Sequence, residues 1–281
     1  MLASSLFRGA SRLGLATVNR NMSIVPAYAS YNNLNITQPS EYVYNLELNR
    51  PKKMNALSME MWGEIGDFFD KVAEDTDCRV VVMSAAGKMF TSGIDLVDLG
   101  DMASIVYSED DIARKCTMIY HKIRRLQKQF STLEKCPKPI IGAIHSACIG
   151  GGVDLICGTD IRVCSADAWF QVKEVDMGLA ADVGTLQRLP RIIGSQSLVN
   201  ELCLTARKLE AAEAEKVGLV SKVYASREEM MTGVLEMAAS IASKSPVAVQ
   251  GTKMNLVYSR DHSPDEGLDY IARYTRFDHI L

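Results

Sequence analysis

Several familiar functional signatures are missing from this 281-residue sequence. Its seven cysteines form no CxxC pair and no zinc-ligand spacing, so we expect reduced thiols buried inside an intracellular protein. GxGxxG and P-loop motifs are absent, which argues against dinucleotide or ATP binding, and no GxSxG elbow marks a serine nucleophile. No run reaches the roughly 18 to 20 apolar residues that cross a bilayer. The net charge of −3 gives no electrostatic footprint for nucleic acid, so neither nucleic acid nor a membrane span is expected.

Acidic residues are also missing from the first forty positions, and the first acid of the chain is Glu41. The same stretch carries Arg8, Arg12 and Arg20 among leucines and serines. This composition is typical of a mitochondrial transit peptide, and it predicts import into the matrix and removal of a segment ending near residue 25. The alternative is a disordered tail with no targeting function. The C-terminal residues FDHIL are not a peroxisomal signal of the SKL type.

From residue 41 onward, strand patterns alternate with helix patterns. Residues 41–48 place apolar side chains at every second position, which predicts a half-buried strand. Residues 79–85 and 138–147 are apolar runs between turn residues and predict strands covered on both faces. Residues 57–75 carry apolar residues at helical spacing, with Ser58 as a possible cap. This order predicts an α/β fold with a sheet and crossover helices.

Helical character dominates after Pro190, and one helix opens with a capping box formed by Ser226 and Glu229. We therefore expect three parts. They are a transit peptide and disordered leader at residues 1–40, an α/β core at residues 41–194 and a helical C-terminal region at residues 195–281.

Two glycine turns follow the buried strands. Residues 148–157, CIGGGVDLIC, come after one strand, and residues 88–99, KMFTSGIDLVDL, come after the other. Glycine lets a backbone approach a ligand closely, and the first N–H groups of a helix have no partner within the helix. One N–H from each turn would form a two-donor oxyanion hole. A glycine run at a strand–helix junction is also common as a plain tight turn, so this motif is weak by itself.

Three longer segments carry a resemblance to a known family. The segments FTSGIDL, HSACIGGGVDL and FQVKEVDMGLAADVGTLQRLP resemble the enoyl-CoA hydratase/isomerase (crotonase) superfamily, within a similarity that runs from about residue 41 to about 270. The resemblance is strongest to the branch that converts 3,5-dienoyl-CoA into 2,4-dienoyl-CoA during β-oxidation of unsaturated fatty acids. It implies a spiral of ββα units, an acyl-CoA substrate, and no metal or cofactor beyond the CoA of the substrate. It also implies a homo-oligomer, a trimer or a dimer of trimers, formed through the C-terminal helical region.

The resemblance assigns roles to individual residues. It implies that the backbone N–H groups of Ile94 and Gly151 hold the thioester oxygen. It implies that Asp154, Glu174 and Asp182 form the catalytic set. The substrate pocket would be lined by Gly151 and by one turn: Ser92, Gly93, Ile94, Asp95 and Leu96.

The chemistry gives an independent reason for this set of acids. Moving two conjugated double bonds by one carbon removes a proton at C2 and adds one at C6, and these sites are too far apart for one short carboxylate. Two acids flanking the diene would serve, one ionised and one protonated. An apolar pocket and mutual repulsion push their pKa values apart, which explains why Glu174 and Asp182 stand among small apolar residues.

Alternatives remain open on sequence alone. Asp154 is expected either to act in catalysis or to stabilise the start of its own helix. Asp176 is interpreted as an acid that caps a turn or binds a neighbouring chain. His145 is interpreted as a core or turn histidine whose ring nitrogens are hydrogen-bonded. The whole chain could instead be an enoyl-CoA hydratase, a delta(3)-delta(2)-enoyl-CoA isomerase, or a catalytically weak acyl-CoA-binding scaffold. The last gains weight from a C-terminal region that ends at Leu281, some tens of residues short of the family pattern.

Overall fold

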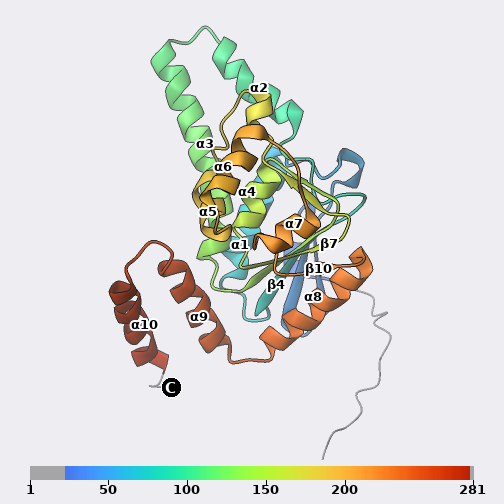
Figure 1. The fold of residues 1–281 in the computed structure, drawn as a ribbon, viewed down its shortest axis with the longest axis vertical. Helices are drawn as coiled ribbons and strands as arrows, with labels where there is room; N and C mark the ends of the chain where they lie inside the picture. Colours follow the sequence, from blue (N-terminus) through green and yellow to red (C-terminus); the bar gives the residue numbers. More distant parts are fainter. Residues whose placement is uncertain (1–22, 279–281) are drawn as a thin grey trace, which may run out of the picture.

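Strands and helices alternate through residues 23–278, the part of the chain that the computed structural model describes (Figure 1). The strands are β1 Ser23–Ile24, β2 Leu34–Ser40, β3 Val43–Leu48, β4 Val80–Ala85, β5 Ile140–Ile144, β6 Ala147–Ile149, β7 Ile161–Ser165, β8 Trp169–Gln171, β9 Leu209–Glu210 and β10 Val223–Tyr224. The α-helices are α1 Met59–Val72, α2 Leu96–Tyr107, α3 Ile112–Lys135, α4 Gly151–Cys157, α5 Thr185–Ile192, α6 Gln196–Thr205, α7 Ala211–Lys216, α8 Arg227–Ala242, α9 Pro246–Tyr258 and α10 Pro264–Asp278. Short 3₁₀ turns are η1 Pro26–Tyr28, η2 Pro51–Lys53 and η3 Glu174–Met177. The predicted α/β class is confirmed.

The main sheet has the strand order β1-β2-β3-β4-β5-β7-β10. Its first three strands pair antiparallel, whereas β3, β4, β5, β7 and β10 all run parallel. A smaller sheet has the order β6-β8-β9. Because the carboxyl ends of β4 and β5 lie at the same edge, the turns that follow them are brought together there.

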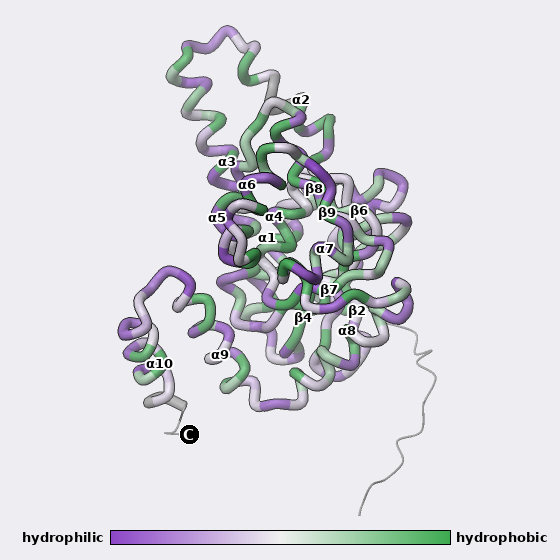
Figure 2. The backbone as a smooth tube through the Cα atoms, viewed as in Figure 1, coloured by the Kyte–Doolittle hydropathy of each residue, from purple (hydrophilic) through white to green (hydrophobic). Residues whose placement is uncertain are grey.

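Both faces of the main sheet are covered. On β4, Val81 and Met83 face a large core shared with α1 and α3, whereas Val80 and Val82 face a second core beneath α8. Strand β3 was predicted to be half-buried, but its Val43 also lies buried in the second core. In Figure 2 the hydrophobic colour concentrates on α1 and α4, while α3 alternates between the two colours along its length.

The predicted helix caps are present. The Ser58 side chain accepts a hydrogen bond from Met61 N at 3.2 Å, which satisfies one free donor at the start of α1. The Ser226 side chain likewise accepts from Glu229 N at 3.1 Å and starts α8. The local sequence therefore determines where both helices begin.

The boundary expected at residue 40 is wrong. Strand β2 pairs antiparallel with β3, with Leu34 opposite Leu48, and Leu34 and Ile36 are buried in the large core. Residues 34–40 therefore belong to the main sheet and not to a disordered leader. The predicted transit peptide itself, before about residue 25, lies almost entirely outside the described residues. The division expected between residues 194 and 195 stays a prediction, although β9, β10 and α8 return to the sheets.

Helices α9 and α10 stand to one side of the body (Figure 1). A buried lysine attaches α9 to the core: the ammonium of Lys253 donates to the carbonyls of Leu133 and Lys138 and forms an ion pair with Asp160 at 2.8 Å. The positive charge of Lys253 is thus paired with a carboxylate, and its ammonium group is hydrogen-bonded, as a buried charge requires.

None of the helices between residues 23 and 278 is long and apolar enough to cross a membrane. All seven cysteines are free thiols, and only Cys116 is exposed.

Candidate active site

The two glycine turns predicted from the sequence lie against each other. Thr91 N donates to the carbonyl of Ala147 at 3.0 Å, and Ile149 N donates to the carbonyl of Thr91 at 3.2 Å. A Cβ placed on Gly93 would lie 2.9 Å from the Ile149 carbonyl oxygen, and one on Gly152 would lie 2.3 Å from the methyl of Thr91. Only glycine permits this approach, because any side chain would push the turns apart.

The two amides expected to form an oxyanion hole have no hydrogen-bond acceptor in the part of the chain that the structure describes. Within residues 23–278, neither Ile94 N nor Gly151 N donates a hydrogen bond to another group. Gly151 is the first residue of α4, where no carbonyl of the same helix is in reach. Ile94 is held by a parallel bridge to Leu57 on the other side of its turn. The geometry therefore leaves two N–H donors on adjacent turns for an external oxygen.

Glu174 lies directly beside this pair of turns. A Cβ on Gly150 would come within 3.2 Å of Glu174 Oε1, so the carboxyl group packs against the residue that precedes Gly151. Glu174 Oε2 is buried and has no hydrogen-bond partner. Burial, followed by the charge of Asp182, raises the pKa of Glu174. A carboxyl group with a raised pKa and an unpaired oxygen is suited to exchanging a proton.

Asp154 is completely buried, with an exposed fraction of 0%. Its Oδ1 accepts a hydrogen bond from Thr185 N at 2.5 Å, whereas Oδ2 has no partner. Burial, and then the charges of Glu174 and Asp182, raise the pKa of Asp154 to about 7. Asp154 lies in the first turn of α4, and its carboxyl group also binds the first amide of α5. Both roles expected for Asp154, in catalysis and at the start of its own helix, stay predictions.

Asp182 is the most accessible of the three acids. As a residue it is exposed, but protein on one side partly buries its carboxyl group, and this burial raises the pKa. Met177 and Leu179 are two of the apolar residues between Glu174 and Asp182 that were expected to line an apolar pocket, and they are 49% and 48% exposed in the single chain. They lie in and just after the turn η3, which runs along the surface. The shielding expected from this segment is therefore incomplete in one chain.

The segment Ser92–Leu96 lies at the edge of the site. Asp95 forms an ion pair with Arg50 at 2.9 Å and accepts a hydrogen bond from Val97 N, so this side chain caps α2. Leu96 is 68% exposed, which leaves it available to an apolar chain. Ser92 donates its backbone N–H to the carbonyl of Met54 and fixes the turn to the loop before α1.

Two residues near the site were not found from the sequence. Thr185 supplies the amide that Asp154 binds, and Gln127 on α3 donates its side-chain N–H to the backbone carbonyl of Asp182 at 2.6 Å. Neither has a sequence signal, since a backbone amide carries none and a helical glutamine usually faces water. Both contacts fix the segment that carries Asp182.

The remaining candidates have structural roles. His145 is buried, its Nε2 lies 3.1 Å from the carbonyl of Gly87, and burial lowers its pKa. Asp176 forms an ion pair with Lys173 on the surface. Among the described residues, no group of histidines, cysteines and acids has the arrangement of a metal site.

Comparisons with known proteins now decide the family. Residues 38–272 match the sequence profile described as enoyl-CoA hydratase/isomerase. The chain belongs to the enoyl-CoA hydratase/isomerase family. The mitochondrial delta(3,5)-delta(2,4)-dienoyl-CoA isomerase of Rattus norvegicus is 56% identical over 247 residues, covering 87% of this chain and 75% of the relative. The peroxisomal delta(3,5)-delta(2,4)-dienoyl-CoA isomerase of Arabidopsis thaliana is 45% identical over 247 residues, covering 87% of this chain and 88% of the relative.

Solved structures agree with this assignment to the enoyl-CoA hydratase/isomerase family. A crystal structure of a Thermobifida fusca protein in complex with acetoacetyl-CoA has a TM-score of 0.77 and 26% identity, and the match covers 91% of this chain and 98% of that one. The expected crotonase-like fold is therefore confirmed.

Proposed function

We propose that this family member isomerises 3,5-dienoyl-CoA to 2,4-dienoyl-CoA. The similar proteins of Rattus norvegicus and Arabidopsis thaliana are both named delta(3,5)-delta(2,4)-dienoyl-CoA isomerase. One observation in the structure carries the proposal furthest. Three carboxyl groups, Asp154, Glu174 and Asp182, lie beside two unpartnered amides, and burial raises the pKa of each carboxyl group. The charge of Asp182 further raises the pKa values of Asp154 and Glu174.

The first step is removal of a proton from C2 of the substrate. The amides of Ile94 and Gly151 donate hydrogen bonds to the thioester oxygen and stabilise the dienolate that forms when the proton leaves. Glu174, packed against Gly150, is the base that takes this proton. Its partnerless Oε2 is the oxygen that we assign to the transfer.

The second step is addition of a proton to C6. Asp182 donates it, because its pKa is raised and its carboxyl group is open to a bound acyl chain. Asp154 is the third member of the set: with one oxygen on Thr185 N, it holds the Asp182 segment, and the charge of Glu174 opposes ionisation of Asp154. The electrons move from the C2–H bond through the diene to the new C6–H bond, so the reaction needs no cofactor beyond the CoA of the substrate.

Purified protein with 3,5-dienoyl-CoA is the direct test. The product has its diene conjugated with the thioester, so turnover appears as a rise in near-ultraviolet absorbance. A matched reaction with a 2-enoyl-CoA measures hydration. Isomerisation in the first reaction with little hydration in the second is the expected result. Dominant hydration, or binding of CoA esters without turnover, contradicts the proposal.

We also propose a mitochondrial location and a homo-oligomeric state. The location is supported by the names of the rat, mouse and human relatives, all mitochondrial, and by the acid-free first forty residues.

Oligomerisation is supported by the exposed apolar side chains Met177, Leu179, Leu186 and Leu204 in one chain. Light scattering of the purified protein gives the mass, and a monomer at micromolar concentration would contradict the second proposal.

A further inference from the structure

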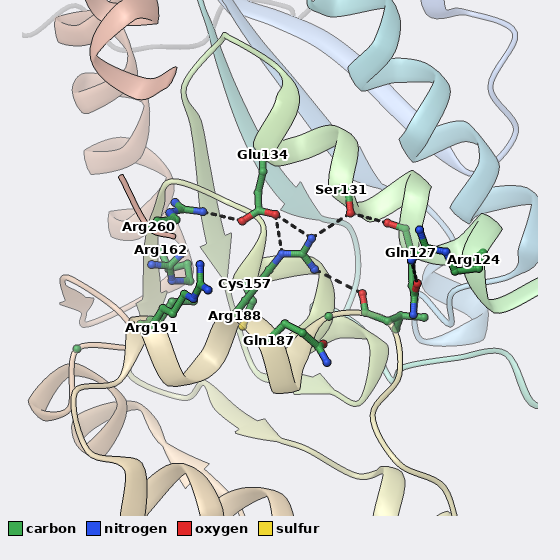
Figure 3. Close-up of a pocket in the computed structure, with 14 residues that line it drawn as sticks. Arg124, Gln127, Ser131, Glu134, Cys157, Arg162, Gln187, Arg188, Arg191 and Arg260 are labelled. Atoms are coloured by element: carbon green, nitrogen blue, oxygen red, sulfur yellow. Dashed lines mark hydrogen bonds and ion pairs between the residues drawn. The ribbon is translucent and has the colours of Figure 1, made fainter. Parts of the chain in front are cut away.

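A cavity of about 650 Å³ lies on the side of α5 where α3 and the end of α9 meet (Figure 3). Five arginines from different elements line it: Arg124, Arg162, Arg188, Arg191 and Arg260. Glu134 is the one acid among the residues that line it. The cavity therefore concentrates positive charge in a chain whose overall net charge is −3.

Both carboxylate oxygens of Glu134 are bound to arginine side chains of the protein. One of its oxygens binds the guanidinium of Arg188 at 2.8 Å, and the other binds Arg260 at 2.6 Å. Arg188 also donates to the hydroxyl of Ser131. Glu134 thus neutralises only one of the two guanidinium charges that it binds, and neither Arg162 nor Arg191 forms an ion pair within residues 23–278.

Three of these arginines gather on one side of that pair. Figure 3 shows Arg162, Arg191 and Arg260 on the side of Glu134 opposite to Arg124. Arg162 donates its Nε and one Nη to the carbonyls of Leu219 and Thr159, so its other Nη is free.

The remaining two guanidiniums have spare donors. The guanidinium of Arg191 makes no hydrogen bond or ion pair with any residue from 23 to 278, and Arg260 uses one guanidinium nitrogen on Glu134. Burial is the main cause that lowers the pKa of Arg162, and the charge of Arg260 adds a smaller effect, so these two guanidiniums are close enough to repel each other. A multivalent anion would relieve this repulsion.

We propose that this cavity binds a phosphate-bearing small molecule, with the phosphate group between Arg162, Arg191 and Arg260. Guanidinium groups match phosphate geometry with paired N–H donors, and three of them supply more charge than a single carboxylate ligand could neutralise. The cavity is much larger than one phosphate and falls within the range of pockets that hold nucleotide-sized ligands. The site is therefore assigned to a phosphate group carried on a nucleotide-sized body.

The site lies next to the candidate active site without being part of it. Val183 and Gly184, which line the cavity, follow Asp182 directly in the chain. The phosphate could belong to a free nucleotide or to the adenosine 3′,5′-bisphosphate portion of a CoA molecule. The proposal rests on the cavity and not on the proposed isomerase activity, and its test measures binding alone.

Calorimetric titration of the full chain at low salt provides that test. The probes are inorganic phosphate, ADP, adenosine 3′,5′-bisphosphate and adenosine. We expect saturable binding of the phosphate-bearing probes, none of adenosine, and weaker binding as salt is added. Tighter binding of the bisphosphate than of ADP identifies a CoA-derived source, and the reverse identifies a free nucleotide; both support the site.

Variants locate the binding. Arg191→Ala removes a guanidinium that has no partner in the described chain, so folding should be unaffected and affinity should fall at least about tenfold, as expected for a charged hydrogen bond. Arg260→Ala should also weaken binding. Arg114→Ala is the matched control, because Arg114 is exposed at the other end of α3 and outside the cavity. Thermal unfolding of each variant confirms that it is folded.

Four results would overturn the proposal. The first three are the absence of saturable phosphate binding, equal binding of adenosine and ADP, and equal affinity of the Arg191→Ala and Arg114→Ala variants. The fourth is a change in oligomeric mass in Arg191→Glu, since the arginines would then form contacts between copies of the chain.

Discussion

The carboxyl groups of Asp154, Glu174 and Asp182 differ mainly in how much water reaches them. Asp154 is sealed in the core, Glu174 is half-buried against a glycine turn, and Asp182 faces the outside. Burial raises all three pKa values, and repulsion between neighbouring charges opposes simultaneous ionisation. Such a gradient suits a reaction in which one acid receives a proton while another delivers one.

Replacing Asp182 with asparagine tests the division of labour. Asparagine keeps the size of the side chain but has no exchangeable acid proton, so turnover of 3,5-dienoyl-CoA should fall by at least about 100-fold. Affinity for CoA esters should change little, because the thioester contacts come from Ile94 and Gly151. Solvent deuterium should still enter C2 of bound substrate through Glu174. Near-normal turnover, or loss of C2 exchange together with turnover, would show that the roles are assigned wrongly.

Asp154 should make stability depend on pH. Its pKa rises from an ordinary value of 3.8 to about 7 on folding, so the folded chain binds this proton more tightly than the unfolded chain. The resulting stabilisation is complete below about pH 4 and is lost as the pH rises through about 7.

The urea midpoints of the parent and Asp154→Asn should therefore be compared at pH 5 and pH 8. The parent should lose more stability over this interval than the variant, which has no proton to release. Asp176→Asn, at an exposed acid paired with Lys173, serves as the control and should follow the parent. Parallel curves for parent and Asp154→Asn would mean that Asp154 stays ionised throughout.

At the scale of elements, the site depends on how α3, α4 and α5 hold the segment around Asp182. The carbonyl of Asp182 is fixed from α3 by Gln127, and Thr185 N is fixed from α4 by Asp154. Arg188 of α5 in turn binds Glu134 of α3. The position of one exposed acid is thus set by contacts to three helices.

Replacing Gln127 with methionine removes the bond to the Asp182 carbonyl while keeping the length of the side chain. Turnover should fall about tenfold with little change in KM, because a small displacement of a catalytic group costs rate rather than binding. Lys128→Met, on the same helix and not bonded to this segment, is the control. If Gln127→Asn restores no activity and KM rises as much as turnover falls, the effect is general destabilisation instead.

The contact between the two glycine turns can be tested with a pair of alanine variants. A Cβ on Gly152 would lie 2.3 Å from the Thr91 methyl, whereas one on Gly100 in α2 meets nothing within 4 Å. Gly152→Ala should destabilise the fold by about 1 to 3 kcal/mol through overpacking and reduce activity. Gly100→Ala should leave activity unchanged and add up to about 1 kcal/mol of stability from helix propensity. Chemical unfolding and the dienoyl-CoA assay measure both; equal behaviour of the variants would contradict the close approach.

At the scale of the whole molecule, the body and the α9–α10 pair are joined by few but strong contacts. Lys253 ties α9 to the core through an ion pair and two carbonyls, and Arg260 reaches Glu134 on α3. Among the described residues, the main sheet begins with β1 at residue 23. The targeting prediction concerns the basic, acid-free sequence around that point.

Fusing residues 1–40 to a fluorescent reporter should direct the reporter to the mitochondrial matrix. The arginines in this segment carry its positive charge, so changing Arg8, Arg12 and Arg20 to glutamine should leave the reporter in the cytosol. Microscopy with a matrix marker measures both. A cytosolic wild-type fusion would contradict the targeting prediction.

Much of the fold follows from the order of residues alone. Apolar runs at residues 79–85 and 138–147 predict buried parallel strands, and the serine before each of α1 and α8 predicts where the helix begins. These features are local, since a strand pattern and a cap each depend on a few neighbouring residues. The family resemblance also identified the three candidate acids, Asp154, Glu174 and Asp182. It could not predict the hydrogen bond that Asp154 accepts from Thr185 N, because Thr185 is 31 residues away along the chain.

Other features were decided only by tertiary structure. Strand β2 looked like part of a leader, and pairing with β3 is what makes it part of the sheet. The amides of Ile94 and Gly151 come from turns more than fifty residues apart, and the pairing of β4 with β5 brings those turns together. The arginine cavity joins α3, α5, β7 and the turn after α9, none of which is basic enough alone to suggest an anion site. Local sequence determines which segments become strands and helices, whereas burial and proximity, which set every pKa at this site, exist only once distant segments pack together.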